Sequence, residues 1–311
     1  MNTGARIVKP GQIEPPAERI RFLFLAGRDI FARRAGRLRF FRSNGHFLGD
    51  YLAFLALLAD AQQKVLDLFS GLPLPDSREQ ARCREQGAPL LGCRSWPRNQ
   101  AWRRGLKTIL EQMGGADLPA AAIKTMDGLL DMGETVLEEM ADKILAGELA
   151  DVSPRELPFV AAALQAYWVH MASSLGEDAF GRPEQGGLCP VCGSYPSAGI
   201  VSGTGARQGL RYLSCPLCAS EWHMVRIKCS ICESTDGISY YALEGSNGAV
   251  KTESCGTCNS YLKMLYLEKD PQMETMADDL ATLALDMLMD KEGMARRGPN
   301  LFFHPGLPFP L

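Results

Sequence analysis

The sequence predicts an α+β protein, with a mainly α-helical N-terminal domain followed by two tandem cysteine-rich modules and a C-terminal helix. Three observations predict this order. Apolar residues recur at helical spacing over about residues 17–180. Eight of the ten cysteines then fall between residues 189 and 258. A further amphipathic stretch opens at Asp270-Pro271 and runs to about Lys291. We therefore expect domains at residues 1–184, 185–227, 228–270 and 271–311.

Three helical stripes define the N-terminal domain. Apolar side chains follow a period of about 3.6 residues over 47–69, 123–144 and 157–171. A glycine is expected to end each stripe: Gly71, Gly147 and Gly176. Before the third stripe, Ser153 and Glu156 predict a capping box, with Pro154 at the first helical position. Residues 72–99 hold four prolines and little periodicity, so we expect a long loop there.

The chain has 311 residues, of which 46% are hydrophobic and 22% are charged, and this balance excludes wholesale disorder and fibrous folds. Its longest apolar run, Tyr51–Ala59, is far shorter than the roughly 18 residues that a membrane helix needs. The N-terminus lacks the apolar core of a signal peptide. We expect a cytoplasmic protein that does not insert into a membrane.

The net charge of −3 conceals two segments of opposite sign. Residues 1–110 carry 19 basic and 9 acidic side chains, whereas residues 111–180 carry 3 and 13. The basic segment could bind nucleic acid or an acidic protein surface, or the two segments could neutralise each other within the chain. A sequence pI of about 5.9 weighs against nucleic acid. The basic segment contains one dense arginine cluster: Arg19, Arg21, Arg28, Arg33, Arg34, Arg37, Arg39 and Arg42.

The eight clustered cysteines form four C-x-x-C pairs with a regular spacing. In each half, 22 residues separate two pairs, and a shift of 40 residues superimposes the first half on the second. This is an internal repeat of one small module. Paired C-x-x-C motifs are typical of a four-thiolate tetrahedral site, so the sequence predicts two tandem rubredoxin-like or zinc-ribbon modules. The predicted metal ligands are Cys189, Cys192, Cys215 and Cys218 in one module, and Cys229, Cys232, Cys255 and Cys258 in the other.

Other uses of these thiols fit the spacing less well. Iron–sulfur motifs usually place three cysteines close together, and a dithiol redox centre needs one pair rather than four. A four-thiolate site accepts iron or zinc, so the residues alone leave the metal open. His223 is expected to pack rather than to serve as a ligand. The remaining thiols, Cys83 and Cys93, are expected to be unpaired.

We expect no enzymatic activity from the residues. A four-thiolate set has no open coordination position, and it normally stabilises a fold that is too small to bury a core. The chain contains no nucleophile elbow, P-loop, dinucleotide fingerprint or H-E-x-x-H motif, and it has only four histidines. A zinc-ribbon nucleic-acid-binding protein and a rubredoxin-like electron-transfer or thiol redox protein stay open as alternatives.

Several motifs extend beyond the cysteines. They are Cys189-Pro190-Val191-Cys192-Gly193, Gly209–Cys215, Glu221-Trp222-His223, Val225–Cys229, Lys251–Gly256, Tyr261-Leu262-Lys263, Glu268–Pro271 and Ala277–Ala281. With these motifs the sequence looks like the formate dehydrogenase accessory protein family, FdhE. The resemblance covers about residues 185–292 and is looser before them.

The resemblance implies a non-catalytic maturation factor. Members of this family are required for the activity of respiratory formate dehydrogenase, and they act in the cytoplasm on its immature catalytic subunit. The family is associated with rubredoxin-type iron binding, which implies iron at two four-cysteine sites, with zinc possible in its place. All eight paired cysteines match the family, whereas Cys83 and Cys93 match no motif in it.

Overall fold

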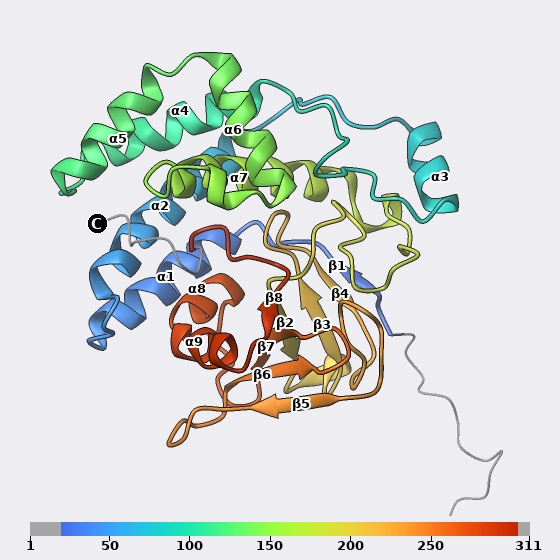
Figure 1. The fold of residues 1–311 in the computed structure, drawn as a ribbon. Helices are drawn as coiled ribbons and strands as arrows, with labels where there is room; N and C mark the ends of the chain where they lie inside the picture. Colours follow the sequence, from blue (N-terminus) through green and yellow to red (C-terminus); the bar gives the residue numbers. More distant parts are fainter. Residues whose placement is uncertain (1–19, 304–311) are drawn as a thin grey trace, which may run out of the picture.

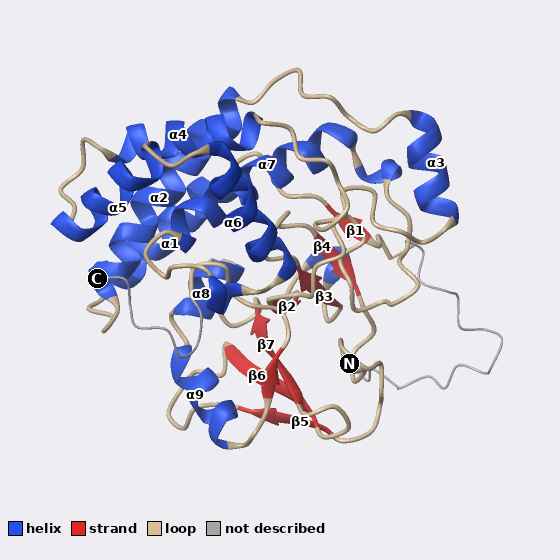
Figure 2. Ribbon diagram, turned by 45° about the horizontal axis from the view of Figure 1, so that its top comes forward, coloured by secondary structure: helices blue, strands red, loops and turns tan. Residues whose placement is uncertain are grey.

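The computed structural model describes residues 20–303. The helices that precede the cysteine-rich part lie together on one side of the molecule, and the strands lie on the other side with the two C-terminal helices beside them (Figure 1). The predicted α+β class and the order of its parts are confirmed. A turned view shows the same arrangement (Figure 2). The helices are α1 (Ile30–Ser43), α2 (Gly49–Leu68), α3 (Ser77–Glu85), α4 (Ala101–Met113), α5 (Ala120–Leu130), α6 (Glu134–Ala146), α7 (Leu157–Leu175), α8 (Thr275–Leu280) and α9 (Leu283–Lys291).

One sheet contains all the strands of the described chain. Its order is β1-β4-β3-β2-β7-β6-β5, and β8 also pairs with β7. Most neighbours are antiparallel, but β2 and β7 are parallel, with Ala198 opposite Lys263 and Val201 opposite Tyr266. The strands are β1 (Leu23–Phe24), β2 (Ala198–Val201), β3 (Arg211–Ser214), β4 (Glu221–His223), β5 (Ile238–Tyr241), β6 (Val250–Cys255), β7 (Ser260–Tyr266) and β8 (Ala295–Arg296).

The 40-residue repeat extends from the cysteines to the strands. Shifting β2, β3 and β4 by 40 residues places them on β5, β6 and β7. The two copies meet along β2 and β7, which are the first strand of one copy and the last strand of the other. Both modules therefore share one continuous sheet. The last strand of the first copy, β4, ends at His223, whereas its counterpart β7 in the second copy continues to Tyr266.

Helix α7 forms the centre of the helical layer. Fifteen of its residues are buried, which suits a helix that is apolar on every side. The Trp168 indole donates to the Leu91 carbonyl at 2.9 Å, which fixes the loop beyond α3 against the helix. Among residues 20–303, no helix is both long and apolar enough to cross a bilayer.

Several helices begin or end at residues other than those that the apolar stripes predict. The second stripe is broken after Leu130, and α6 begins only at Glu134. The expected capping box at Ser153 does not form. Instead Ser153 starts a turn, and α7 has Glu156 at its N-cap without a side-chain hydrogen bond. In the first stripe, Phe47 is exposed ahead of α2.

The structure differs from the prediction in one loop and in the continuity of the C-terminal helix. The expected loop 72–99 contains α3, whose N-cap Asp76 forms a capping box with Glu79. No residue of α3 is buried, so it lacks the apolar stripe that predicts a helix. The predicted C-terminal helix is present but is divided into two short helices, α8 and α9. Met287 in α9 is exposed. The tail from residue 304 and Arg19 of the arginine cluster lie outside the described residues.

Much of the arginine cluster is neutralised within the chain. Arg34 pairs with Glu274 at 3.1 Å and Arg37 with Asp278 at 2.6 Å, and all four side chains are buried. These pairs attach α1 to α8. The acidic segment 111–180 pairs with other basic residues, since Glu138 contacts both Arg98 and Arg103. Other members of the cluster pair at the surface through Arg21–Glu177, Arg39–Asp60 and Arg42–Asp50.

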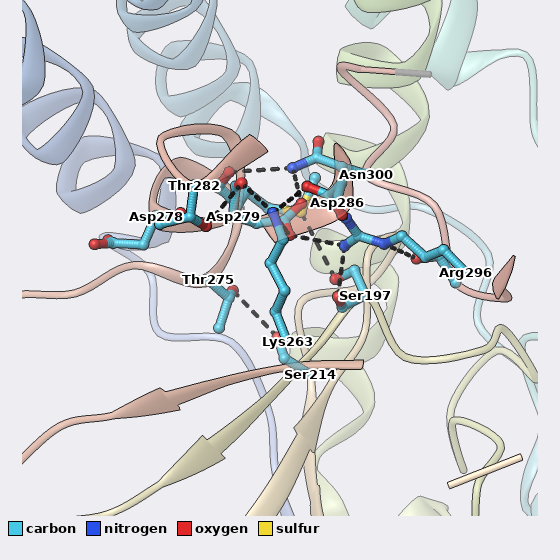
Figure 3. Close-up of polar contacts among 12 residues, drawn as sticks. Ser197, Ser214, Lys263, Thr275, Asp278, Asp279, Thr282, Asp286, Arg296 and Asn300 are labelled. Carbon is cyan, nitrogen blue, oxygen red and sulfur yellow. Dashed lines mark hydrogen bonds and ion pairs between the residues drawn. The ribbon is translucent and has the colours of Figure 1, made fainter. Parts of the chain in front are cut away.

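A second group of buried charges fixes the C-terminal segment to the sheet (Figure 3). Lys263 of β7 contacts Asp279 at 3.2 Å and also pairs with Asp286. Arg296 of β8 pairs with the same two carboxylates, at 2.9 and 3.2 Å. Asn300 donates to Asp279 at 2.8 Å. Each cation faces two carboxylates, so the charges compensate one another inside the protein.

Lys263→Met is expected to destabilise the protein strongly. Burial opposes ionisation of Asp279, but Arg296 and Lys263 outweigh it and hold the pKa of this carboxyl below its ordinary value. Removing Lys263 leaves buried carboxylates with one cation fewer, which typically costs about 3–5 kcal/mol. Denaturant titration measures this loss. Lys107→Met removes an exposed pair with Glu111 and is the control, expected to change the unfolding free energy by less than about 0.5 kcal/mol. An equal effect of both changes would contradict the stabilising role of the buried group.

Gly187 marks the closest approach between the two modules outside the sheet. A Cβ atom at Gly187 would lie 1.7 Å from the Ser230 carbonyl oxygen and 2.8 Å from its carbon. The neighbouring Gly186 amide donates to Glu233 at 2.9 Å, and the Gly186 carbonyl accepts from the Trp222 indole. The segment before the first cysteine pair therefore packs directly on the turn that carries the third pair.

Gly187→Ala is accordingly expected to displace the turn around Ser230. Both nearest atoms are backbone, so the chain must shift, and overpacking of this kind costs about 1–3 kcal/mol. Gly128→Ala in α5 is the matched control, because its added methyl group meets nothing within 4 Å. Thermal unfolding of both variants measures the difference. If Gly187→Ala is as stable as the wild type, the contact between the modules does not restrict the backbone.

Candidate metal centres

Each C-x-x-C pair lies on a tight turn that we call a knuckle. The first to fourth knuckles span residues 189–194, 215–220, 229–234 and 255–260. In every knuckle the residue after the second cysteine has a positive φ: Gly193 at 75°, Ala219 at 53°, Glu233 at 61° and Asn259 at 49°. Only the first is a glycine, so three knuckles hold an ordinary residue in the left-handed region, where it is disfavoured. The backbone is therefore turned in the same way four times.

A serine follows two residues after each pair, so the full motif is C-x-x-C-x-S in all four knuckles. The amide of each first cysteine in the first three knuckles donates to the carbonyl of this serine, at 3.0, 3.0 and 2.8 Å. In the fourth knuckle, Cys255 and Ser260 are paired across β6 and β7. These bonds close each turn at its base and direct both sulfur atoms to one side.

The first and second knuckles bring four sulfur atoms together. We call this set the first site: Cys189, Cys192, Cys215 and Cys218. All four residues are buried, and their Sγ atoms lie within 4.8 Å of one another. The Cys189–Cys218 and Cys192–Cys215 sulfur separations are 3.5 and 3.3 Å. Backbone amides of Leu217 and Cys218 each donate to the Cys215 sulfur at 3.4 Å.

The third and fourth knuckles repeat this arrangement in the second site, which comprises Cys229, Cys232, Cys255 and Cys258. Its Sγ atoms also lie within 4.8 Å of one another. Cys229–Cys258 and Cys232–Cys255 are both separated by 3.7 Å. The Ile231 amide donates to the Cys229 sulfur at 3.3 Å. Here Cys229 and Cys255 are buried, Cys258 is half-buried and Cys232 is exposed.

The sulfur separations fit a tetrahedral metal ion. A metal–sulfur bond of about 2.3 Å implies sulfurs about 3.8 Å apart in a regular tetrahedron. The second site matches this edge closely, and the first is slightly tighter. These distances far exceed the roughly 2.05 Å of a disulfide, and all ten cysteines are free thiols. Both sites therefore offer four sulfur donors with the geometry that Zn²⁺ or Fe²⁺ requires.

One cysteine in each site is biased toward the thiolate. At Cys192 burial opposes ionisation, but hydrogen bonds with Cys189, Cys215 and Cys218 hold its pKa well below the ordinary value. At Cys255 burial also opposes ionisation, and hydrogen bonds from the Cys258 and Thr257 amides lower its pKa to about 7. A metal binds the thiolate rather than the thiol, so these groups favour the first step of binding.

The other predicted residues lie apart from the metal ligands or beside them. His223 packs edge-on against the Tyr212 ring, 5.6 Å between centroids, and belongs to neither sulfur cluster. Cys83 lies in α3, away from the paired cysteines in sequence. Cys93 is half-buried next to the first site, where its amide donates to the Cys192 carbonyl at 2.8 Å. Burial raises the Cys93 pKa to about 11, so this thiol is protonated near neutral pH.

Sequence reasoning missed the residues that support the sulfurs. Ser194, Ser220 and Ser260 place hydroxyl oxygens 3.3, 3.3 and 2.9 Å from Cys192, Cys218 and Cys258. The repeated serine in C-x-x-C-x-S was the available signal. Gln165 of α7 donates to the Pro216 carbonyl in the second knuckle at 2.5 Å. No local pattern identifies that contact, because 51 residues separate the partners.

Comparison with known proteins agrees with this arrangement. Family models described as "FdhE, N-terminal", "FdhE, central domain" and "FdhE, C-terminal domain" match residues 20–183, 188–226 and 227–303. The Protein FdhE homolog of Enterobacter sp. (strain 638) is 43% identical over 287 residues, and Protein FdhE of Salmonella typhimurium (strain LT2) is 42% identical over the same length. Each alignment covers 91% of this chain and 91% of the relative.

A solved structure is similar over nearly the whole chain. The crystal structure of the FdhE protein from Pseudomonas aeruginosa superimposes with a TM-score of 0.82 at 39% sequence identity. The match covers 92% of this chain and 100% of that one. The resemblance predicted from the sequence motifs is thereby confirmed, and this chain belongs to the FdhE family.

Proposed function

We propose that this protein is a non-catalytic accessory factor that binds the immature catalytic subunit of formate dehydrogenase in the cytoplasm and supports its maturation. One observation carries the proposal. A chain of the FdhE family gathers eight of its ten cysteines into two four-sulfur sites, on a sheet that packs against a helical layer. The sites stabilise the sheet region, and the exposed surfaces of the protein contact the client subunit.

Iron is the metal that we propose for both sites, with zinc as the alternative. Cys189, Cys192, Cys215 and Cys218 would hold one ion, and Cys229, Cys232, Cys255 and Cys258 the other. A bound ion supplies cross-links between turns that are distant in sequence. The chain itself contributes closed turns and amide hydrogen bonds to sulfur at both sites, and it places the first site in the hydrophobic core. All four coordination positions are filled by sulfur, which leaves none for a substrate.

The alternative of a nucleic-acid-binding protein has less support. Arg34 and Arg37 are buried in ion pairs with the C-terminal segment, so they cannot contact phosphates. Arg39 and Arg42 pair with Asp60 and Asp50 at the surface. A phosphate-binding surface instead requires several free cations, and its affinity falls steeply with salt.

The metal assignment predicts a defined stoichiometry. Protein purified without oxygen is expected to contain about two ions per chain, because each four-thiolate set holds one. Cys189→Ser is expected to reduce this to about one ion, whereas Cys83→Ser, which alters a thiol of α3, leaves two. Elemental analysis and the visible spectrum give the number and identity of the metal. Unchanged metal content in Cys189→Ser would refute the ligand assignment.

The accessory role predicts that formate dehydrogenase depends on this protein. A host that lacks the gene is expected to lose formate dehydrogenase activity and to regain it with the wild-type chain. The purified protein is expected to retain the separately expressed catalytic subunit on an affinity column. Cys83→Ser serves as the variant control in both assays. Full formate dehydrogenase activity without the chain, together with no retention of the subunit, would overturn the proposed role.

A further inference from the structure

The first site is enclosed by the helical layer. The Leu91 amide donates to the Val191 carbonyl at 3.0 Å, and the Cys93 amide donates to the Cys192 carbonyl at 2.8 Å. These bonds place the loop that follows α3 over the first knuckle. On the second knuckle, Gln165 of α7 donates to the Pro216 carbonyl. All four cysteines of this site belong to the main hydrophobic core.

Gln165 also connects the first site to buried charge. Its side-chain oxygen accepts from Arg34 at 2.8 Å and from Gln62 at 3.0 Å. Arg34 in turn pairs with Glu274. The cover of the second knuckle is therefore held by α1, α2 and the segment before α8 at once. Opening this side of the first site would require several buried polar groups to lose their partners together.

The second site has no such cover among the residues that the structure describes. Its knuckles form hydrogen bonds with each other, with neighbouring residues of their own copy, with Gly186, and with Ala295 of β8, whose amide donates to the Asn259 carbonyl at 2.8 Å. None of these hydrogen bonds joins the knuckles to a helix. None of its four cysteines belongs to a hydrophobic core cluster. Cys232 is exposed, and the adjacent Glu233 forms a partly exposed ion pair with Lys228. One face of the four-sulfur set therefore meets solvent.

Exposure of one ligand changes how a metal ion can leave. A four-thiolate ion has no free position, so a competing ligand must displace one sulfur atom. A competing ligand can reach the metal ion beside a solvent-exposed thiolate and displace that thiolate, whereas at a buried site the surrounding structure must open first. Cys232 provides such an access point, and its repeat equivalent, Cys192, is buried under the loop that follows α3.

We propose that the second site exchanges its metal ion with solution through Cys232, whereas the first site retains its ion as a permanent part of the fold. The ligand is a divalent cation that accepts four thiolates. This inference rests on the proposed function, because it assumes that both sites bind metal. The exchangeable site faces outward, where an external thiol or metal donor can reach it.

The test uses the full-length protein loaded with zinc. The protein is mixed with the chromogenic chelator 4-(2-pyridylazo)resorcinol, and the release of zinc is followed by absorbance. We expect two phases of about one ion each, with the first at least about tenfold faster than the second. The reaction is then stopped after the fast phase, and the free thiols are alkylated with iodoacetamide. Among the eight metal ligands, mass spectrometry is expected to find the label at Cys229, Cys232, Cys255 and Cys258, whereas label at Cys83 and Cys93, which belong to neither site, does not bear on the result.

Matched variants assign the phases independently. Cys232→Ser is expected to remove the fast phase and to leave one slowly released ion. Cys192→Ser changes the equivalent position of the first copy, and it is expected to keep the fast phase and lose the slow one. The alkylation result requires no variant, so it holds even where Cys192→Ser fails to fold.

The outcomes separate this inference from the proposed function. Two ions released in one phase, or early label on the first-site cysteines, would overturn the inference while leaving two metal sites in place. A total of one ion or none in the zinc-loaded wild type would overturn both the inference and the metal assignment. If the wild type releases zinc in two distinct phases but does not bind the formate dehydrogenase subunit, the accessory role alone would be overturned.

Discussion

The parallel hydrogen bonding between β2 and β7 is the constraint on which the sheet region depends. Each copy of the repeat supplies only three short strands, which is the smallest number that can form an independently stable sheet. Pairing Ala198–Val201 with Lys263–Tyr266 satisfies the backbone groups at the inner edge of both copies. It also joins the first strand of one copy to the last strand of the other, so the two copies occupy unequal positions in one sheet.

This inequality explains why one motif produces two different environments. Four knuckles share the same turn, the same positive φ and the same serine, so the local geometry of the sulfurs is nearly identical. The surroundings of the two sites differ because only the first site lies under the helical layer, where Gln165 and the Leu91 loop cover it. The knuckles of the second copy lie farther along the sheet. Outside the β2–β7 pairing, the second copy contacts the first through Gly186, Gly187 and the Arg211–Glu253 ion pair.

The sequence predicted the features that depend on neighbours along the chain. Cysteine spacing, turn residues and the 40-residue repeat are local patterns, and they located both sulfur clusters. Helix α3 was missed because it buries no residue and so shows no apolar period. The β2–β7 pairing and the Gln165 contact join distant segments, and no local pattern specifies them. The positive charge of the arginine cluster could be read from the sequence, but its ion-pair partners could not, because Arg34 and Glu274 are 240 residues apart.

The buried ion pairs connect the two ends of the described chain. Arg34 and Arg37 in the first helix are paired with Glu274 and Asp278, and both partners must be present because a lone buried charge costs more than the pair contributes. Such pairs add little net stability compared with apolar packing, but they penalise any arrangement in which α8 leaves α1. Helix α8 follows the sheet in sequence and α1 precedes it. The sheet therefore cannot separate from the helical layer unless these ion pairs break and their charges are exposed to water or left unpaired. The first site, which lies at that junction, is therefore held closed by contacts that involve both ends of the fold.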